Sequence, residues 1–298
     1  MKYIFVVNGR EDKGGTIRED LDRQLSEVDL QNEIYETKGV GDGIRFVRIY
    51  CDLHAEEEVT FIACGGSGTL NEVASGVVGF KNKQVGFLAF GQTNDLTKYY
   101  PDRDFKSLKK LLNGTVRNID IIRANNWYSL NMINVGFDAF VSYEGNQYMD
   151  AGMGFRKAYA TALLKCVLTK RRNGIQVVAD GVRLNKKSML LCSVANAQWC
   201  GGMFHCSPRA VVDDGLIDVT LYKPCSLISF VILLMHYKNG DMFESRFCKR
   251  RLVYCRAKHL ELKSKDILFI SPDGEVCADI DFVIDVLPGE ISFILPEK

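Results

Sequence analysis

Over its first 120 residues the sequence alternates short apolar runs with segments in which apolar residues recur at helical spacing. Alternating strands and helices are typical of a parallel sheet whose two faces are covered by helices. In such sheets, ligands bind beyond the carboxyl ends of the strands. The predicted strands are Tyr3–Asn8, Gln31–Glu36, Val59–Cys64 and Val85–Phe90, and the predicted helices are Ile17–Val28, Asp42–Cys51 and Leu70–Val78.

After Asp120 the pattern changes to strand-like runs separated by turns, which favours a second, mainly antiparallel and β-rich domain. A length of 298 residues suits two domains. We place them at 1–121 and 122–298, and a return of the last residues, near 290–298, to the first domain stays open. The second domain is expected to hold helices over Arg156–Lys170 and Ser226–Tyr237. Its predicted strands are Ile175–Ala179, Ser188–Ala195, Leu216–Tyr222, Arg251–Arg256, His259–Leu262, Ile267–Ile270 and Phe282–Leu287.

The charge is nearly balanced, because 38 Lys and Arg stand against 37 Asp and Glu, for a formal net charge of +1. A nucleic-acid-binding protein usually has a basic excess, so no nucleic-acid partner is expected. The apolar run near the N-terminus is too short for a signal-peptide core, and Leu227–Met235 is far below the ~20 residues of a membrane span. Ten cysteines without C-x-x-C spacing do not indicate a disulfide scaffold. We therefore expect a cytoplasmic protein with reduced thiols.

The predicted strand Val59–Cys64 leads into Gly65-Gly66-Ser67-Gly68-Thr69 and then into a helix. Glycines let a backbone approach a phosphate closely, and the N–H groups and dipole at a helix start favour an anion there. By itself, the segment is either a phosphate site or a plain tight turn. Its spacing matches neither G-x-x-x-x-G-K-[ST] nor G-x-G-x-x-G, which disfavours a P-loop NTPase and a standard dinucleotide site.

Extended to Gly65-Gly66-Ser67-Gly68-Thr69-Leu70-Asn71-Glu72, the segment resembles G-G-D-G-T-x-N-E. This is the nucleotide loop of the superfamily of diacylglycerol kinases, sphingosine kinases and bacterial lipid kinases, and NAD kinases share its core. Further short matches follow in the family's order along nearly the whole chain, and the later ones distinguish it from NAD kinases. They are Asn8 (an Asn-Pro position), Thr37–Gly43, Gly91–Asp95 (G-T-x-N-D), Asn134–Ala139 (N-x-x-G-x-D-A), Asn196-Ala197 with Gly201-Gly202, Pro208–Ala210, Asp213–Val219 (D-G-x-L-D-V) and Asp273-Gly274-Glu275 (D-G-E).

The resemblance implies an α/β N-terminal domain with an NAD kinase-like parallel sheet, a mainly antiparallel β-rich C-terminal domain, and an active-site cleft between them. It implies an ATP-dependent lipid kinase that transfers the γ-phosphoryl of ATP to a hydroxyl of a membrane lipid, diacylglycerol-like or related, with ATP and Mg²⁺ as cofactors. Phosphoryl transfer depends mostly on positioning and electrostatic stabilisation. By the resemblance, the catalytic residues are Glu275, Asp273, Asp95 and Ser67, with Glu275 as general base. The nucleotide-binding residues are Asn8, Thr37, Gly65, Gly66, Ser67, Gly68, Thr69, Glu72, Gly91, Thr93 and Asn94.

Ser67 departs from the family, which has an aspartate at this position. A hydroxyl carries no charge to hold Mg²⁺ and is a poor base near neutral pH, and Gln92-Thr93 in place of Thr-Gly is a second departure. An engineered substitution, a kinase that uses other carboxylates, and a nucleotide-binding or regulatory protein with little activity all account for Ser67. An NAD kinase-like phosphotransferase is the alternative enzyme. We predict that Ser67→Asp raises Mg²⁺-dependent ATP turnover.

Two possible metal sites follow from residue type. Asp214 with the carbonyl of Leu216 could hold a structural Mg²⁺, since hard cations prefer carboxylate and carbonyl oxygens, but an ordinary Asp-Gly turn explains these residues equally well. Cys200, His205 and Cys206 could suggest zinc. No second ligand pair follows at finger-like spacing, so we favour buried or bystander side chains.

A basic stretch includes Arg246, Lys249, Arg250 and Arg251. Residues 245–258 contain no Asp or Glu. The stretch is either a solvated strand face or a surface that meets anionic headgroups, at roughly 1 kcal/mol per well-placed base. A kinase that acts on a lipid in a bilayer needs such a peripheral contact, together with an apolar patch. Leu227–Met235 could contribute the patch, although we favour burial in the core for this segment. Neither the lipid nor the oligomeric state leaves a signature in the sequence.

Overall fold

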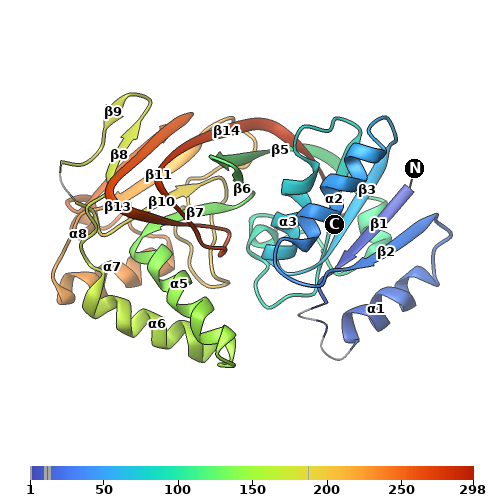
Figure 1. Ribbon diagram of the computed structural model, residues 1–298, viewed down its shortest axis with the longest axis horizontal. Helices are drawn as coiled ribbons and strands as arrows, with labels where there is room; N and C mark the ends of the chain where they lie inside the picture. The colour runs from blue at the N-terminus through green and yellow to red at the C-terminus, as the bar shows by residue number, and fades with distance from the viewer. Residues whose placement is uncertain (1, 10–11, 13–14, 187) are drawn as a thin grey trace. The chain divides into compact units, whose positions relative to one another are not determined.

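The computed structural model describes residues 2–9, 12, 15–186 and 188–298 (Figure 1). The chain divides into two compact units, residues 1–121 with 288–298 and residues 122–287. Two strands, β5 (Thr115–Ala124) and β14 (Cys277–Leu295), begin in one unit and end in the other. Among the described residues, no helix combines the length and the apolar character that crossing a membrane requires.

The first unit contains the predicted parallel sheet, which is thereby confirmed. Its strands are ordered β2–β1–β3–β4–β14, and β14 contributes Ser292 and Phe293 to the pairing with β4. The other strands are β1 (Lys2–Val7), β2 (Asn32–Glu36), β3 (Val59–Gly65) and β4 (Lys83–Ala89). The helices are α1 (Thr16–Leu25), α2 (Asp42–Leu53), α3 (Ser67–Val77), α4 (Leu108–Leu112) and the 3-10 helix η1 (Asp95–Tyr99).

The central strand β3 is buried along its whole length. On one face, Ile62 packs in a cluster with Leu21 of α1 and Leu108 of α4. On the other face, Phe61 meets the Tyr50 ring of α2 edge-on, with ring centroids 5.7 Å apart. A parallel strand that is covered on both sides needs a nearly continuous apolar sequence, and this explains the run that precedes the glycine loop.

The second unit is β-rich and mainly antiparallel, as the family resemblance implies. Its strands are ordered β12–β11–β10–β7–β13–β14, and β13 pairs in addition with β8. The strands are β6 (Trp127–Ser129), β7 (Met132–Gly136), β8 (Gln176–Ala179), β9 (Val182–Arg183), β10 (Leu191–Ala195), β11 (Ile217–Tyr222), β12 (Leu252–Ala257) and β13 (His259–Pro272). The helices are α5 (Phe137–Asp150), α6 (Phe155–Thr169), α7 (Leu227–Asn239) and α8 (Arg246–Lys249).

Two apolar clusters stabilise the second unit. The first lies among strands and includes Val177 of β8, Leu260 of β13 and Phe282 of β14. The second lies beneath the helices and includes Cys166 of α6 and Phe230 of α7. Figure 1 shows α5, α6 and α7 together on one side of the strands of this unit, which is the side that the second cluster fills.

Some predicted elements differ from those of the structure. His259–Leu262 and Ile267–Ile270 belong to one strand, β13, whose register shifts between Lys263 and Leu268. Helix α5 has no counterpart in the prediction, because it packs through small buried residues such as Gly145 and not through a stripe of large apolar ones. A pattern search for large apolar residues cannot detect such a helix.

Helix α7 differs from the burial that we expect for Leu227–Met235. It places Phe230, Leu233 and Tyr237 in the core. The remaining apolar residues of the helix, apart from the half-buried Leu234, are exposed. The expectation that this segment is buried in the core therefore holds for one face of the helix and is wrong for the other.

Candidate functional site

The glycine loop is held by the segment that follows the neighbouring strand β4. The carbonyl of Gly65 accepts the N–H groups of Phe90 at 3.0 Å and Gly91 at 2.8 Å. A Cβ atom on Gly65 would lie 2.4 Å from the hydroxyl oxygen of Thr69, so any larger residue requires a shift of the loop. The glycine at this position is thus required by close packing at the end of β3.

Asn8, which follows β1, lies against the same loop. Its Nδ2 donates to Thr69 Oγ1 at 2.9 Å, and its N–H donates to the carbonyl of Cys64 at 3.0 Å. Thr69 itself is buried. Asn8, Gly65 and Thr69 were predicted to line the nucleotide, and the fold brings all three together.

Ser67 begins α3 and connects it to the segment after β4. Its N–H and its hydroxyl both donate to the carbonyl of Thr93, at 2.8 and 3.0 Å. The same hydroxyl accepts the N–H of Asp95 at 3.0 Å. An ionised aspartate could accept from Asp95 but has no proton to donate to Thr93. Ser67, Thr93 and Asp95 therefore form one hydrogen-bonded group at the loop.

The start of α3 has the features of an anion site. The first N–H groups of a helix lack carbonyl partners within it, and the helix dipole favours negative charge at this end. Gly68 and Thr69 lie in this first turn. A Cβ atom on Gly68 would meet no heavy atom within 4 Å, so the space beside the backbone is open. These residues fit a phosphate group of ATP.

Asn94 adds a polar atom that lacks a protein partner. Its Nδ2 donates to the carbonyl of Gly91 at 2.9 Å, whereas its Oδ1 is buried and accepts no hydrogen bond from the described residues. A buried acceptor without a donor costs about 1–3 kcal/mol. A donor group on a bound ligand would remove that cost, which makes Asn94 a candidate ligand contact.

Glu72 of α3 connects this helix to the segment that begins α2. Its two carboxylate oxygens accept the N–H groups of Gly41 and Gly43, each at 2.8 Å, at the start of α2. Burial raises the pKa of this carboxyl, and the backbone donors oppose that rise. Thr37, whose N–H donates to the carbonyl of Val7 at 2.9 Å, begins the segment that leads to α2. Glu72 thus holds residues 41–43 in place.

In the second unit, Asp273 occupies a tight turn after β13 with a φ of 45°, a left-handed conformation that Asp tolerates. Its Oδ2 accepts the hydroxyl of Ser129 at 3.0 Å and the N–H groups of Leu130 at 2.8 Å and Asn131 at 3.0 Å. Its Oδ1 accepts the N–H of Met132 at 3.1 Å. Burial raises the pKa of the carboxyl to about 6, although the four donors lower it. The carboxylate is saturated by residues 129–132.

Glu275 lies two residues further in the same turn. Its N–H donates to the carbonyl of Pro272 at 2.9 Å, and the residue is half-buried. The turn that the D-G-E triplet predicts is present. Asp273 is half-buried as well, and the two acids differ in that the carboxylate of Asp273 anchors the turn to residues 129–132.

Two buried polar groups of this unit were not assigned a role from the sequence. The Oδ1 of Asn131 is buried and has no partner in the described part of the chain, while its Nδ2 donates to the carbonyl of Trp199 at 2.6 Å. Asp138 belongs to the N-x-x-G-x-D-A match and lies in the first turn of α5. That match is the only signal in the sequence that could have indicated either group, and it concerns Asp138 alone.

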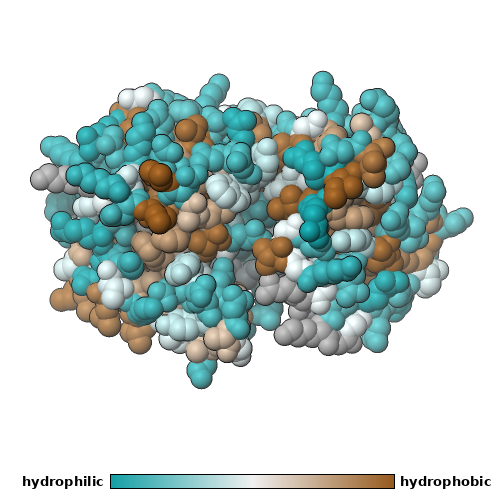
Figure 2. All heavy atoms as spheres, viewed as in Figure 1, coloured by the Kyte–Doolittle hydropathy of each residue, from teal (hydrophilic) through white to brown (hydrophobic). Residues whose placement is uncertain are grey.

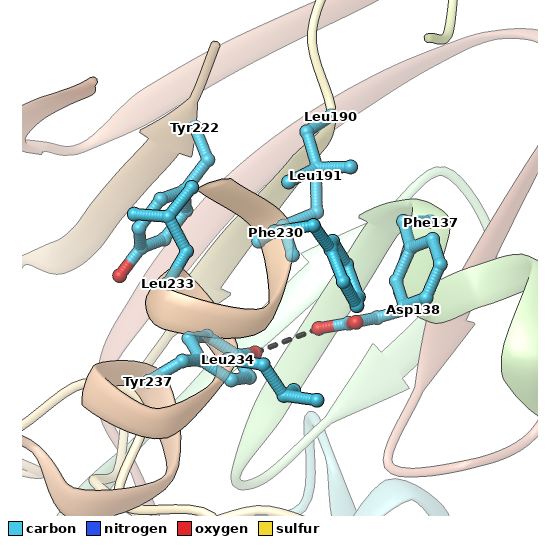
Figure 3. Close-up of a pocket in the computed structure, with 9 residues that line it drawn as sticks. All are labelled: Phe137, Asp138, Leu190, Leu191, Tyr222, Phe230, Leu233, Leu234 and Tyr237. Carbon is cyan, nitrogen blue, oxygen red and sulfur yellow. Dashed lines mark hydrogen bonds between the residues drawn. The ribbon is translucent and has the colours of Figure 1, made fainter. Parts of the chain in front are cut away.

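Figure 3 shows the surroundings of Asp138. The hydroxyl of Tyr237 donates to Asp138 Oδ2 at 2.7 Å and lies 3.0 Å from the hydroxyl of Ser193. Burial raises the pKa of Asp138 to about 6. The cavity beside the pair measures about 20 Å³, which is room for about one water molecule and too little for a lipid chain. It is otherwise lined by Phe137, Leu190, Leu191, Tyr222, Phe230, Leu233 and Leu234.

The residues of the Mg²⁺ site considered from the sequence are engaged with protein groups. Asp214 accepts the N–H of Leu216 at 3.1 Å in its own turn, and its other oxygen forms an ion pair with Arg256. Because a cation already neutralises this carboxylate, the residues fit an Asp-Gly turn and do not fit a Mg²⁺ site. Within the described residues, no three His, Cys, Asp or Glu side chains are grouped so that they could hold a metal ion.

The three residues of the zinc alternative are also engaged with protein groups. The Sγ atoms of Cys200 and Cys206 lie 3.3 Å apart, and both residues are thiols. The ring of His205 stacks on Trp199 with centroids 4.3 Å apart, and its Nε2 lies 3.2 Å from Gln198 Oε1. The imidazole therefore forms contacts that do not involve the thiols.

The predicted basic residues separate into two kinds. Arg246, Lys249 and Arg250 are exposed. Arg251 is half-buried, lies over the ring of Phe247 at 3.8 Å, and donates to the carbonyl of that residue at 3.1 Å. Three of the four cations are thus free to face an anionic surface, whereas Arg251 is held against the protein.

The sequence and the fold are similar to those of known proteins. Residues 2–124 match the diacylglycerol kinase catalytic domain, and residues 131–295 match the YegS C-terminal NAD kinase beta sandwich-like domain. The chain is 25% identical over 233 residues to "Diacylglycerol kinase" of Bacillus subtilis (strain 168), which covers 77% of this chain and 73% of that protein. It is 25% identical over 305 residues to "Probable lipid kinase YegS-like" of Chromohalobacter salexigens, which covers 98% and 93%. The fold resembles the crystal structure of a diacylglycerol kinase from Bacillus anthracis str. Sterne, with a TM-score of 0.69, 18% identity and coverage of 99% of this chain and 96% of that one.

Proposed function

We propose that this chain, which belongs to the family of lipid kinases that combine a diacylglycerol kinase catalytic domain with a YegS C-terminal domain, transfers the γ-phosphoryl group of ATP to a hydroxyl of a membrane lipid. The observation that carries the proposal is the glycine loop at the start of α3. Open space at Gly68 lies beside the first-turn N–H groups of a helix, and Asn8 orients Thr69 next to them. This combination suits a polyphosphate.

The nucleotide would be held mainly by backbone groups of the first unit. The first-turn N–H groups at Gly68 and Thr69 would bind phosphate oxygens, and Asn94 Oδ1 would accept a hydrogen bond from the ligand. Glu72 would not contact the nucleotide and would stabilise the first unit by keeping residues 41–43 in position. Binding through backbone N–H groups preserves the site geometry while the phosphoryl group is transferred.

Mg²⁺ enters the proposal as the ion that accompanies ATP, where it neutralises charge on the phosphates. Proteins usually hold such an ion with one or two carboxylates and the substrate phosphates. Asp95, which is buried and whose N–H is bonded to Ser67, is the carboxylate beside the glycine loop. Its Oδ1 lies 3.9 Å from Lys98 Nζ, a looser ion pair than that of Asp214 with Arg256. We assign no Mg²⁺ to Asp214, because Arg256 occupies that carboxylate.

On the acceptor side, we assign the general base to Glu275. It accepts the proton of the lipid hydroxyl as that oxygen attacks the γ-phosphorus, and the bond from the γ-phosphorus to the bridging oxygen breaks to release ADP. Asp273 is a positioning residue in this proposal. Its carboxylate already accepts four hydrogen bonds from residues 129–132, so we assign it no contact with the substrate hydroxyl. By holding the turn, it fixes the backbone from which Glu275 projects.

Labelled ATP with a panel of diacylglycerol, sphingosine, phosphatidylglycerol and NAD tests the proposal. We expect label in a lipid, and loss of that label in Glu275→Gln. Label in NAD alone would favour an NAD kinase-like enzyme. ATP binding without transfer to any of them would favour a regulatory nucleotide-binding protein, the candidate that an uncharged Ser67 supports.

A further inference from the structure

Helix α7 presents an apolar face to solvent over about two and a half turns. Five of its residues lie on this face and are exposed by 38% to 77%: Leu227, Ile228, Val231, Ile232 and Met235. Their spacing is that of one side of a helix, opposite to the side that Phe230 and Tyr237 bury. An apolar helix is normally covered all round, so a bare face of this length marks an interaction surface.

The end of α6 extends this face. Leu164 and Leu168 are each 66% exposed, one turn apart. Leu168 lines the same hollow as Pro224 and Ser226, which lead into α7. Figure 2 shows apolar side chains gathered over α6 and α7, at the lower left of the view. We call these seven exposed apolar residues of α6 and α7 the α7 face.

Cations gather where the α7 face begins. Arg171 and Arg172 line the hollow beside Ser226, and a guanidinium N–H of Arg171 donates to the carbonyl of Cys225 at 3.3 Å. The Nζ of Lys223 lies 3.4 Å from the carbonyl of Arg250, so the predicted basic stretch adjoins the same end of the helix. Residues 151–179 and 219–240 contain no Asp or Glu. The α7 face is therefore bordered by positive charge and is free of acidic residues along the helices that form it.

We propose that the α7 face docks this protein onto an anionic phospholipid bilayer, with the apolar side chains inserted among the lipids and Arg172, Lys223 and Arg250 against the headgroups. This inference rests on the proposed function, because it states how a kinase of a membrane lipid would reach its substrate. Bilayer docking combines buried apolar area with attraction between basic residues and anionic lipids, and both requirements are met here. A second copy of the chain suits the face less well, since a symmetric pair would repeat the same cations on both sides of one interface.

Co-sedimentation of the full chain with vesicles, without ATP, tests the docking. Vesicles of phosphatidylcholine with phosphatidylserine should bind the protein, and binding should fall with salt and be weak on phosphatidylcholine alone. The variant Ile228→Ser/Val231→Ser/Met235→Ser should lose binding by about tenfold or more, because three apolar anchors are removed. Arg172→Glu/Lys223→Glu should also weaken binding and flatten its salt dependence, at roughly fivefold per cation.

A matched control variant makes the same kind of substitutions elsewhere on the surface of the same unit. Val182→Ser/Ile267→Ser/Ile280→Ser removes three apolar residues of the same unit that are 64% to 71% exposed but lie on β9, β13 and β14. This variant should bind vesicles like the wild type. Wild-type binding by the α7 triple variant, equal losses in both triple variants, or a wild-type dimer that the α7 substitutions dissociate would overturn the docking proposal.

The docking proposal and the kinase proposal can be refuted independently of each other. If docking is right, the α7 triple variant keeps wild-type turnover on a short-chain diacylglycerol in solution while it loses turnover on vesicles. A wild type that binds vesicles through α7 but phosphorylates no lipid in any form would leave the docking intact and refute the kinase. If the wild type phosphorylates the soluble lipid but the α7 substitutions do not change vesicle binding, the kinase proposal stands and the docking proposal is refuted.

Discussion

The Ser67 hydroxyl donates a hydrogen bond to the carbonyl of Thr93 at 3.0 Å. The N–H of Ser67 donates to the same carbonyl at 2.8 Å, so α3 is joined twice to the segment after β4. This relationship shows what the family's aspartate would change here. A carboxylate would bring negative charge to the loop and would lose the bond that the hydroxyl donates to Thr93.

Ser67→Asp should therefore raise Mg²⁺-dependent ATP turnover and lower stability at the same time. We expect turnover to rise about tenfold, which corresponds to 1.36 kcal/mol of the barrier. The lost hydrogen bond to Thr93 should cost about 1 kcal/mol in the free energy of unfolding. Steady-state kinetics with Mg·ATP and urea denaturation measure the two effects.

Ser67→Ala is the control for charge, because it removes the hydroxyl without adding a carboxylate. It loses the bond to Thr93 and also the one accepted from Asp95, so it should lower stability by more than Ser67→Asp and leave turnover at or below the wild-type level. The charge argument fails if Ser67→Asp and Ser67→Ala have the same activity.

The buried carboxyl of Asp138 should make stability depend on pH. Its pKa in the folded protein is raised to about 6, above the ordinary value of 3.8, so the folded state binds this proton more tightly than the unfolded chain does. The stabilisation is complete below about pH 4 and is lost as the pH rises through 6. Asp138→Asn removes the titration while a carbonyl remains to accept from Tyr237. Between pH 4 and 7, unfolding free energies should shift in favour of the variant by up to about 3 kcal/mol.

Asp150 provides the control for this experiment, because it is exposed at the end of the same helix. Asp150→Asn should follow the wild type across the pH range. A constant difference between Asp138→Asn and the wild type at every pH would show that Asp138 does not titrate on folding.

The fold of the first unit could be predicted because its signals are local. A continuous apolar run gives β3, two glycines end it, and helical spacing begins soon afterwards. Helix α7 could be recognised for the same reason, but its exposure could not. Its residues are apolar on all sides, and which side is buried depends on packing against Cys166 and other residues distant in sequence.

Sequence motifs predict which residues belong to the candidate site, but they do not distinguish the roles of those residues. The D-G-E triplet indicates a turn with two acidic side chains, and nothing in it distinguishes them. The distinction comes from Ser129 to Met132, more than 140 residues earlier, whose donors converge on Asp273. Such long-range hydrogen bonds have no local pattern, so a sequence motif can name both residues without showing which one anchors the turn.

Glu72→Gln should destabilise the protein without changing its affinity for ATP. One of the two backbone N–H groups, of Gly41 or Gly43, would then face an amide NH₂ group in place of a carboxylate oxygen. Loss of a buried hydrogen bond to a charged group should cost about 1.5–3 kcal/mol. Thermal or chemical denaturation measures the loss, and the KM for ATP should stay constant at temperatures where both proteins are folded. An increase in KM with unchanged stability would instead indicate direct contact with the nucleotide.

Glu275→Gln should abolish most of the phosphoryl transfer. Removal of a general base typically costs 10²- to 10⁴-fold, and we expect a loss of about that size in kcat. Stability and ATP binding should change little, because the turn is anchored by Asp273 and the proposed nucleotide site lies in the first unit. The exposed Glu244 serves as control through Glu244→Gln, which should leave kcat unchanged. If Asp273→Asn is stable and Glu275→Gln fully active, the roles of the two acids must be reversed.

Gly68→Ala tests the phosphate site without disturbing the fold. A methyl group here meets no protein atom within 4 Å, and alanine favours the helix over glycine by up to about 1 kcal/mol, so stability should stay the same or rise. The same methyl group would occupy the open space beside the first-turn N–H groups of α3. We therefore expect the KM for ATP to increase about tenfold or more while the unfolding free energy is maintained.

Gly65→Ala completes this test, because it places the same methyl group three residues earlier in the loop. Its Cβ would lie 2.4 Å from Thr69 Oγ1 and 3.0 Å from the Cβ of Asn8, so the loop must shift and stability should fall by about 1–3 kcal/mol. The two variants distinguish space left open for a ligand from space that packing requires. Gly68→Ala should weaken ATP binding without lowering stability, whereas Gly65→Ala should mainly lower stability. Normal ATP affinity in a stable Gly68→Ala protein would mean that the phosphates do not approach this turn, and the proposed nucleotide site would have to be abandoned.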